Sequence, residues 1–227
     1  MIIKTNIAGI NTKVDSENKK FIRNLHCFGC EFRGEPAVSL KVTDYEIRNF
    51  CSKYKGFDRD SAVLRLYAEK FMNELPEFGG FGIKAITFKI GSKVFVAASK
   101  SPEENRHFVS VLEGQADDIG VLDEAYAAVV TSGDTVFVYS TPFSKSPANE
   151  KNILSGIILP GSVRSVEKAG RKDIFDRFSL LLPLPKKCEQ LAAAAASFDL
   201  IDKKVLCLRV PAEDPEAFYA YIKNLPE

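Results

Sequence analysis

The segment from Lys93 to Leu112, KVFVAASKSPEENRHFVSVL, holds the residues of this sequence that are best placed to do chemistry. Its run Val94–Ala98 is apolar and partly β-branched, which is typical of a strand buried on both faces. Ser101 and Pro102 then suit the N-cap and the first position of a helix. The segment therefore predicts a strand, a tight turn and a helix, which is the geometry of a phosphate-binding loop.

The chemistry of a phosphate-binding loop is missing from this turn. A GxxxxGK[ST] loop brings backbone N–H groups to the phosphates through its glycines, while its lysine and hydroxyl serve the phosphates and Mg²⁺. Here Glu103 and Glu104 begin the helix, where their carboxylates would repel a triphosphate. A replacement anion site and a plain solvated turn are the two interpretations. The candidates for binding a ligand or phosphate are Lys100, Ser101, Asn105 and Arg106.

Three further residues are candidates for catalysis. Asp123 and Glu124 end a short apolar run, the position at which an acidic pair in an α/β nucleotide site holds Mg²⁺ or polarises a nucleophile. Surface acids at a strand end are the alternative interpretation of that pair. His107 is one of two histidines, and neither stands in a G-x-S-x-G context. We expect no bound metal, with Asp123 and Glu124 as the candidates if one is present.

The composition of the chain narrows the classes of function. The sequence has 227 residues, of which 45% are hydrophobic and 27% are charged, with a formal net charge of +1. This mixture indicates a globular protein and gives no electrostatic argument for binding nucleic acid or an anionic membrane. No signal peptide and no apolar run of about 18 residues is found, so we expect a cytoplasmic location.

The five cysteines are scattered and odd in number, which argues against a disulfide framework. Cys27 and Cys30 form a single CxxC motif beside His26, but a zinc site needs a second pair of ligands that the sequence does not offer. Two thiols near the end of a helix are the simpler interpretation.

The elements that must position these residues fall into two parts. Residues 1–55 are expected to form a small strand–helix–strand unit, with a strand over Ile2–Ile10, a helix capped by Ser16 and a strand over Ala37–Val42. Residues 56–227 are expected to form the core.

That core is expected to begin with an amphipathic helix over Ser61–Leu75, which Pro76 ends. Asp214 and Pro215 start a last amphipathic helix, with Phe218, Tyr221 and Leu225 inward. The expected strands are Ala85–Ile90, Lys93–Ala98, Ala127–Thr131, Thr135–Tyr139, Ile153–Leu159, Val163–Val166 and Val205–Val210.

The order of these features resembles the HPr kinase/phosphorylase-like group with the phosphoenolpyruvate-carboxykinase-type P-loop fold, and most nearly its small bacterial HPr kinase-related branch. The likeness covers most of the chain as a pattern. The segments that carry it are MIIKTNIAGINTKVD, AVSLKVTDYEI, LPEFGGFGIKAITFKIGSKVFVAASKS, VLDEAYAAVV, TVFVYSTPF and DPEAFYAYI.

The chain departs from that group at the loop itself. Family members usually carry a GxGKS-type loop after the position of Ser101; here Pro102 and Glu104 occupy the glycine positions, Asn105 the lysine position and Arg106 the hydroxyl position. A histidine common before the first hairpin is replaced near Lys84. The resemblance implies the fold, while these changes argue against kinase or phosphorylase activity.

We therefore expect an α/β fold, α+β by strict count, whose mixed central sheet is of the HPr kinase/carboxykinase type and is flanked by helices. The leading hypothesis is a catalytically degenerate protein that binds or scaffolds, has no cofactor, and has another protein or peptide as its partner. A homo-oligomer is compatible with the sequence. The alternative is a kinase or phosphatase that uses Mg-ATP or phosphate in a rearranged site.

Overall fold

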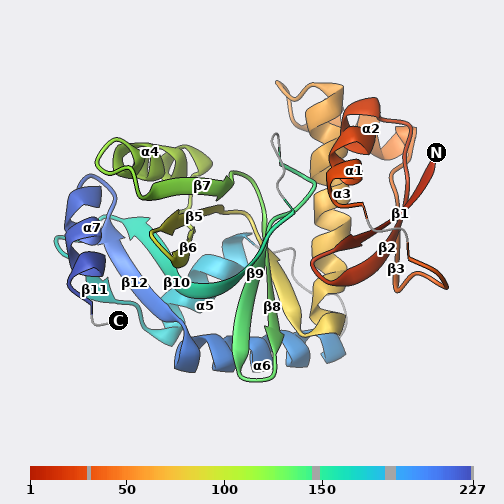
Figure 1. The fold of residues 1–227 in the computed structure, drawn as a ribbon. Helices are drawn as coiled ribbons and strands as arrows, with labels where there is room; N and C mark the ends of the chain where they lie inside the picture. Colours follow the sequence, from red (N-terminus) through yellow and green to blue (C-terminus); the bar gives the residue numbers. More distant parts are fainter. Residues whose placement is uncertain (30–31, 145–148, 182–187, 226–227) are drawn as a thin grey trace.

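The protein has a mixed α/β fold in which a large mixed sheet is flanked by helices and a smaller sheet lies at the N-terminal end (Figure 1). The structure, a computed structural model, describes residues 1–29, 32–144, 149–181 and 188–225. The mixed sheet flanked by helices agrees with the class predicted from the sequence.

The N-terminal sheet has the order β1-β2-β3, formed by β1 (Ile2–Ile7), β2 (Ile10–Asp15) and β3 (Val38–Lys41). The prediction of one strand over Ile2–Ile10 is wrong, because the chain turns at Ala8 and Gly9 and returns antiparallel as β2. Both turn residues have positive φ, 53° and 82°, as a two-residue type I′ hairpin requires.

Three helices pack with this sheet: α1 (Lys19–Cys27), α2 (Asp44–Lys53) and α3 (Arg59–Glu74). Asn18, and not Ser16, caps α1 by accepting a hydrogen bond from the N–H of Phe21. Helix α3 buries Tyr67 and Phe71 against the sheet. The same apolar cluster includes Ala128 and Phe143, so the N-terminal elements share a core with part of the large sheet.

The large sheet follows the order β4-β8-β9-β10-β6-β5-β7, and β12 pairs with β10 and β11. The short 3₁₀ helix η1 (Leu75–Phe78) joins α3 to the first of these strands. The nine strands described in this sheet are β4 (Gly80–Ile83), β5 (Ile86–Ile90), β6 (Lys93–Ala97), β7 (Ile119–Asp123), β8 (Ala127–Ser132), β9 (Thr135–Tyr139), β10 (Lys151–Gly161), β11 (Glu167–Lys168) and β12 (Leu206–Pro211).

Strand β10 connects the two halves of the large sheet. Its first residues, Lys151–Ile153, pair antiparallel with β9, and its later residues pair parallel with both β6 and β12. A register shift between Leu154 and Gly156 marks the change of partner. Strand β6, which leads to the turn of interest, is therefore held between β10 and β5 in the interior of the sheet.

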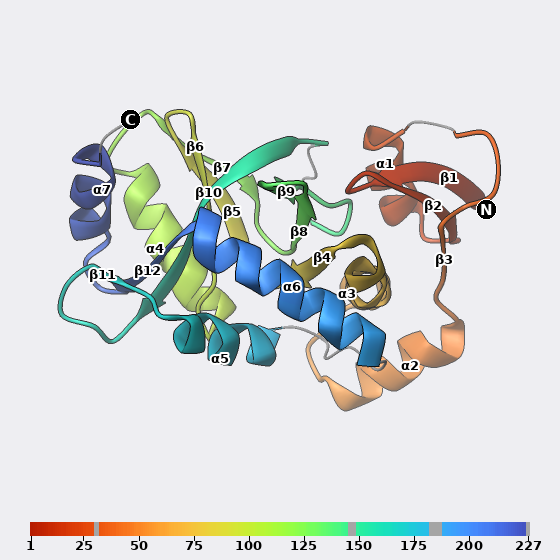
Figure 2. The ribbon, with the colours of Figure 1, turned by 90° about the horizontal axis from the view of Figure 1, so that it is seen from below.

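Helices cover both faces of this part of the sheet (Figure 2). On one face α4 (Pro102–Glu113) and α7 (Pro215–Lys223) contribute Phe108 and Phe218 to a cluster with Phe88 and Phe95. On the other face α5 (Arg171–Leu181) and α6 (Cys188–Lys204) contribute apolar side chains such as Ile174. The start of α4 is thereby fixed at the end of β6.

Two sequence predictions in the C-terminal part are wrong. Val163–Val166 is not a strand, because β10 continues through Pro160 to Gly161 and the next pairing residues are those of β11. Tyr221 does not face inward: it is 37% exposed, and Ile222 takes the buried position of α7 beside Phe218.

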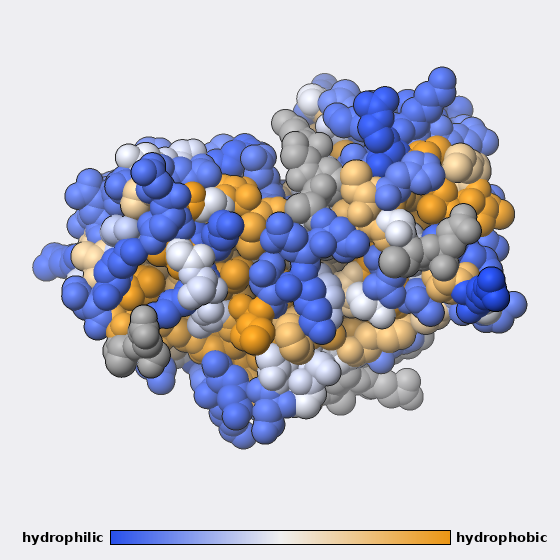
Figure 3. All heavy atoms as spheres, viewed as in Figure 1, coloured by the Kyte–Doolittle hydropathy of each residue, from blue (hydrophilic) through white to orange (hydrophobic). Residues whose placement is uncertain are grey.

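In the orientation of Figure 1, hydrophobic side chains show between hydrophilic ones over the middle of the large sheet and around the N-terminal strand (Figure 3). Ile2 and Ile153 are among the large hydrophobic residues that are exposed. Among the described residues, no helix combines the length and the apolar character that crossing a membrane requires.

The close approach of α3 to β4 depends on Gly82. A Cβ atom at Gly82 would fall 1.7 Å from the sulfur of Met72 on α3. We expect Gly82→Ala to lower the free energy of unfolding by about 1–3 kcal/mol, because overpacking forces the helix and strand apart. Urea denaturation measures the effect.

Gly114→Ala is the matched control, since its φ of −72° suits alanine and the nearest atom to a new Cβ lies 3.5 Å away. That variant should stay within about 1 kcal/mol of the wild type. Equal stability of the two variants would contradict the tight contact between α3 and β4.

Candidate functional site

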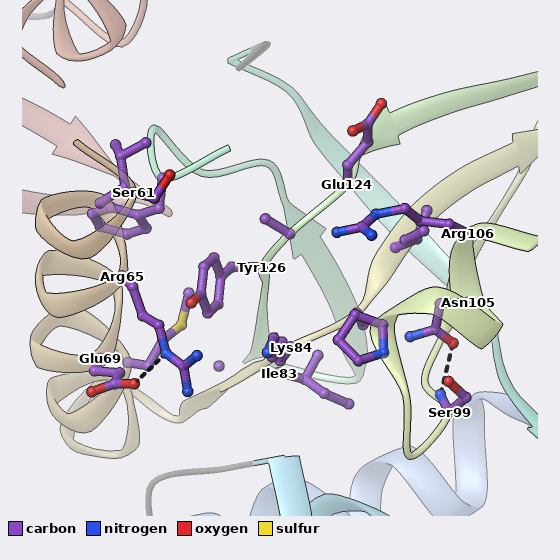
Figure 4. Close-up of a pocket in the computed structure, with 18 of the residues that line it drawn as sticks. Ser61, Arg65, Glu69, Ile83, Lys84, Ser99, Asn105, Arg106, Glu124 and Tyr126 are labelled. Carbon is purple, nitrogen blue, oxygen red and sulfur yellow. Dashed lines mark hydrogen bonds and ion pairs between the residues drawn. The ribbon is translucent and has the colours of Figure 1, made fainter. Parts of the chain in front are cut away.

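A pocket of about 680 Å³ opens between α3 and the start of α4 (Figure 4). Its floor is the connection between β4 and β5, which carries Lys84 and Ala85. The connection between β7 and β8, from Glu124 to Tyr126, forms a third side. Four segments that are separated in the sequence therefore meet at one cavity.

The predicted strand, turn and helix are confirmed. Strand β6 ends at Ala97, and α4 begins at Pro102 with Ser101 as its N-cap. The hydroxyl of Ser101 accepts a hydrogen bond from the N–H of Glu104 at 3.4 Å. The N–H of Ala98 donates to the carbonyl of Ile158 on β10, which ties the start of the turn to the sheet.

Two backbone N–H groups of this turn donate to side chains of the same segment. Ser99 N donates to Oδ1 of Asn105 at 2.7 Å, and Ser101 N donates to Oγ of Ser99 at 3.2 Å. Asn105 is only 3% exposed, so its side chain serves as a buried internal acceptor for the turn. The N–H groups of Ser99 and Ser101 are therefore already used within the chain.

The two acidic residues Asp123 and Glu124 lie in different environments. Asp123 is 2% exposed, whereas Glu124 is exposed and lines the pocket. Oδ1 of Asp123 accepts from the N–H of Ala125 at 3.0 Å, and Oδ2 accepts from the N–H of Thr141 at 2.9 Å. Asp123 therefore fastens the β7–β8 connection to the segment that follows β9.

Burial raises the pKa of the Asp123 carboxyl group to about 6, although the hydrogen bonds from backbone N–H groups act in the opposite direction. Both of its oxygens already accept hydrogen bonds from this chain. Within the described ranges, no group of three or more His, Cys, Asp and Glu side chains could hold a metal ion.

The remaining predicted residues differ in their positions. Lys100, Arg106 and Glu124 are exposed and line the pocket, and Arg106 reaches toward the segment that carries Glu124 (Figure 4). His107 is exposed on α4 and does not line the pocket. Cys27 has an exposed free thiol, and its CxxC partner Cys30 lies outside the described residues.

Apart from Glu124, sequence reasoning did not place the pocket residues that come from outside the loop, among them Arg65 and Lys84. Arg65 on α3 donates to Glu69 at 2.9 Å, and its guanidinium lies over the ring of Phe57 at 5.5 Å. Lys84 is half-buried, and burial lowers the pKa of its ammonium group. Its position between two short apolar strands, in GFGIKAITF, is the one sequence signal that could have indicated a cation held inside the fold.

Comparisons with known proteins add no identification. No protein-family model matches this sequence, and no curated protein matches it.

The internal acceptor at Asn105 can be tested through stability. Asn105→Ala leaves the buried N–H of Ser99 without its partner, so we expect the free energy of unfolding to fall by about 1–3 kcal/mol. Arg106→Ala changes the neighbouring exposed residue and should stay within about 0.5 kcal/mol. Urea denaturation of the two variants should separate them, and equal stabilities would show that the Asn105 bond contributes little.

The buried carboxyl group of Asp123 predicts a pH dependence. Its pKa rises from 3.8 to about 6 on folding, so the folded state binds more protons between these values. The carboxyl group of Asp123 therefore contributes its full stabilisation below about pH 4. This stabilisation is lost as the pH rises through about 6, and the free energy of unfolding falls by about 3 kcal/mol.

We expect Asp123→Asn to remove this part of the pH dependence, as measured by urea denaturation between about pH 4 and 7. Glu124→Gln, at the exposed neighbour, should keep the wild-type dependence. If the free energy of unfolding of the Asp123→Asn variant depends on pH in the same way as that of the wild type, the raised pKa of the Asp123 carboxyl group is contradicted.

Proposed function

We propose that this protein is a degenerate relative of the HPr kinase/phosphorylase-like proteins, with a sheet of the carboxykinase P-loop type, that binds a ligand or partner without ATP-dependent phosphotransfer. Two features support the relationship. A strand, turn and helix lie at the expected place in the chain. The VLDE and YSTPF segments meet through the hydrogen bonds between Asp123 and Thr141.

The main support for a protein without phosphotransfer is that backbone N–H groups of the turn donate to acceptors of the same segment. Ser99 N and Ser101 N donate to acceptors within the turn, and Pro102 has no N–H to offer. Phosphate binding by a loop needs several such groups to face the ligand, on a backbone that glycine leaves free to adopt the required dihedral angles. The turn has no glycine to provide this freedom.

The charges at the start of α4 support the same proposal. Glu103 and Glu104 lie in the first turn of the helix, where they complement the helix dipole in place of an anion. The carboxylate of Glu103 accepts a hydrogen bond from the hydroxyl of Ser101 at 2.7 Å and lies 4.0 Å from Arg106. A triphosphate at this point would displace these contacts and meet negative charge.

The alternative is a kinase or phosphatase that holds phosphate by side chains. Lys100, Arg106 and Glu124 line one pocket, and this arrangement is what favours the alternative. Such an enzyme would need Arg106 to leave Glu103 and bind phosphate, with Glu124 toward Mg²⁺. The leading proposal instead gives the pocket to a ligand or to part of a protein or peptide partner, and needs no cofactor.

Titration calorimetry and thermal shift with Mg-ATP, Mg-ADP, pyrophosphate and phosphate distinguish the two. A ligand at about 100 times its Kd stabilises the folded state by about 2.7 kcal/mol, which either method detects. We expect no stabilisation by any of the four. Sub-millimolar binding of Mg-ATP that is lost in Arg106→Ala would contradict the proposal and establish the rearranged site.

A further inference from the structure

Lys84 is a half-buried cation that belongs neither to the turn before α4 nor to the acidic pair Asp123 and Glu124. It stands on the β4–β5 connection at the floor of the pocket, between Arg65 on the α3 side and Arg106 on the α4 side (Figure 4). In the part of the chain that the structure describes, its ammonium group forms no ion pair or hydrogen bond. A half-buried cation that no carboxylate contacts directly is costly, so the site favours an anion.

The charged groups around Lys84 come from both flanking helices. Arg65 and Glu69 face it from α3, and Glu103 and Arg106 face it from α4. Arg65 is held by Glu69 at 2.9 Å, and Arg106 lies 4.0 Å from Glu103. Since each arginine already has a carboxylate nearby, the ammonium of Lys84 is the cation left for a ligand on the pocket floor.

The balance of charge limits the ligand to a low charge. Four cationic side chains and three carboxylates line the pocket, which leaves an excess of one positive charge. A monoanion would neutralise this excess, whereas a triphosphate would add negative charge beside Glu69, Glu103 and Glu124. A carboxylate fits a single ammonium donor through a charge-assisted hydrogen bond.

About half of the residues that line the pocket are apolar or aromatic. Leu64 and Met72 come from α3, Ile83 from the end of β4, and Tyr126 and Phe143 from the segments joined by Asp123. Burial raises the pKa of Tyr126 to about 12, so its phenol is neutral at physiological pH. Such walls contribute affinity by covering an apolar body beside the charged end of a ligand.

We propose that this pocket binds an organic monocarboxylate with an aromatic or branched apolar body, its carboxylate on Lys84 and its body against Tyr126 and Phe143. This inference rests on the proposed function, because it assigns the pocket to a ligand other than a nucleotide. The carboxylate belongs either to a free small acid or to the C-terminus of a peptide, and the two sources share the same chemistry at Lys84.

The test uses the full chain and defined probes, followed by titration calorimetry and amide chemical shifts. Phenylacetate represents the free acid, N-acetyl-phenylalanine represents a peptide C-terminus, and phenylacetamide is the neutral control. We expect at least one carboxylate to bind about tenfold more tightly than the amide, which is a difference of about 1.4 kcal/mol. Tighter binding of N-acetyl-phenylalanine than of phenylacetate assigns the site to a peptide C-terminus, and the reverse order to a small acid.

Lys84→Met should weaken binding of the carboxylate by about tenfold or more, while Lys89→Met, at an exposed lysine that does not line the pocket, should change it by less than about threefold. In the wild-type protein, the pKa of the Lys84 ammonium, followed by NMR after reductive ¹³C-methylation, should rise when the carboxylate binds. This second measurement does not depend on the folding of the variant.

Equal affinity for phenylacetate and phenylacetamide, no binding of either carboxylate up to about 10 mM, or an unchanged pKa of Lys84 on binding would overturn the inference. A parallel titration with Mg-ATP distinguishes a failure of this inference from a failure of the proposed function. If Mg-ATP is silent and the carboxylates fail, only this inference is wrong; if Mg-ATP binds in the pocket, the proposed function is wrong as well.

Discussion

One buried hydrogen bond, from the N–H of Ser99 to Oδ1 of Asn105, determines the form of the turn between β6 and α4. It closes the chain on itself at the point where a phosphate-binding loop would open its N–H groups toward a ligand. An unpaired N–H at this depth would cost about 1–3 kcal/mol, so the turn keeps this acceptor.

Asp123 plays a comparable part on the opposite side of the pocket. Its two oxygens accept from Ala125 and Thr141, and this joins the strand that precedes the pocket wall to the segment that carries Phe143. Two buried polar side chains, Asn105 and Asp123, thus hold the frame of the site. Within this frame, and among the residues that the structure describes, the ammonium group of Lys84 forms no ion pair or hydrogen bond, and the proposed carboxylate site rests on this observation.

Local chemistry explains how far the sequence predicted this structure. The apolar run before Ser99 and the Ser101–Pro102 pair were enough to predict the strand, the turn and the helix. Strand β2 was missed because Ala8, a residue without a turn preference, adopts a positive φ. The pocket was missed because Arg65 and Lys84 meet α4 only through tertiary packing, and no local spacing relates them. The burial of Asn105 and Asp123 likewise follows from the fold and not from their neighbours in sequence.

Amide hydrogen exchange of Ser99 and Ser101, followed by NMR with and without Mg-ATP, tests the central claim most directly. If the donors of the turn are satisfied internally, both amides are protected in the free protein, and neither their exchange nor their chemical shifts change when the nucleotide is added. Fast exchange in the free protein, with protection gained on adding Mg-ATP, would show instead that the turn opens to bind phosphate.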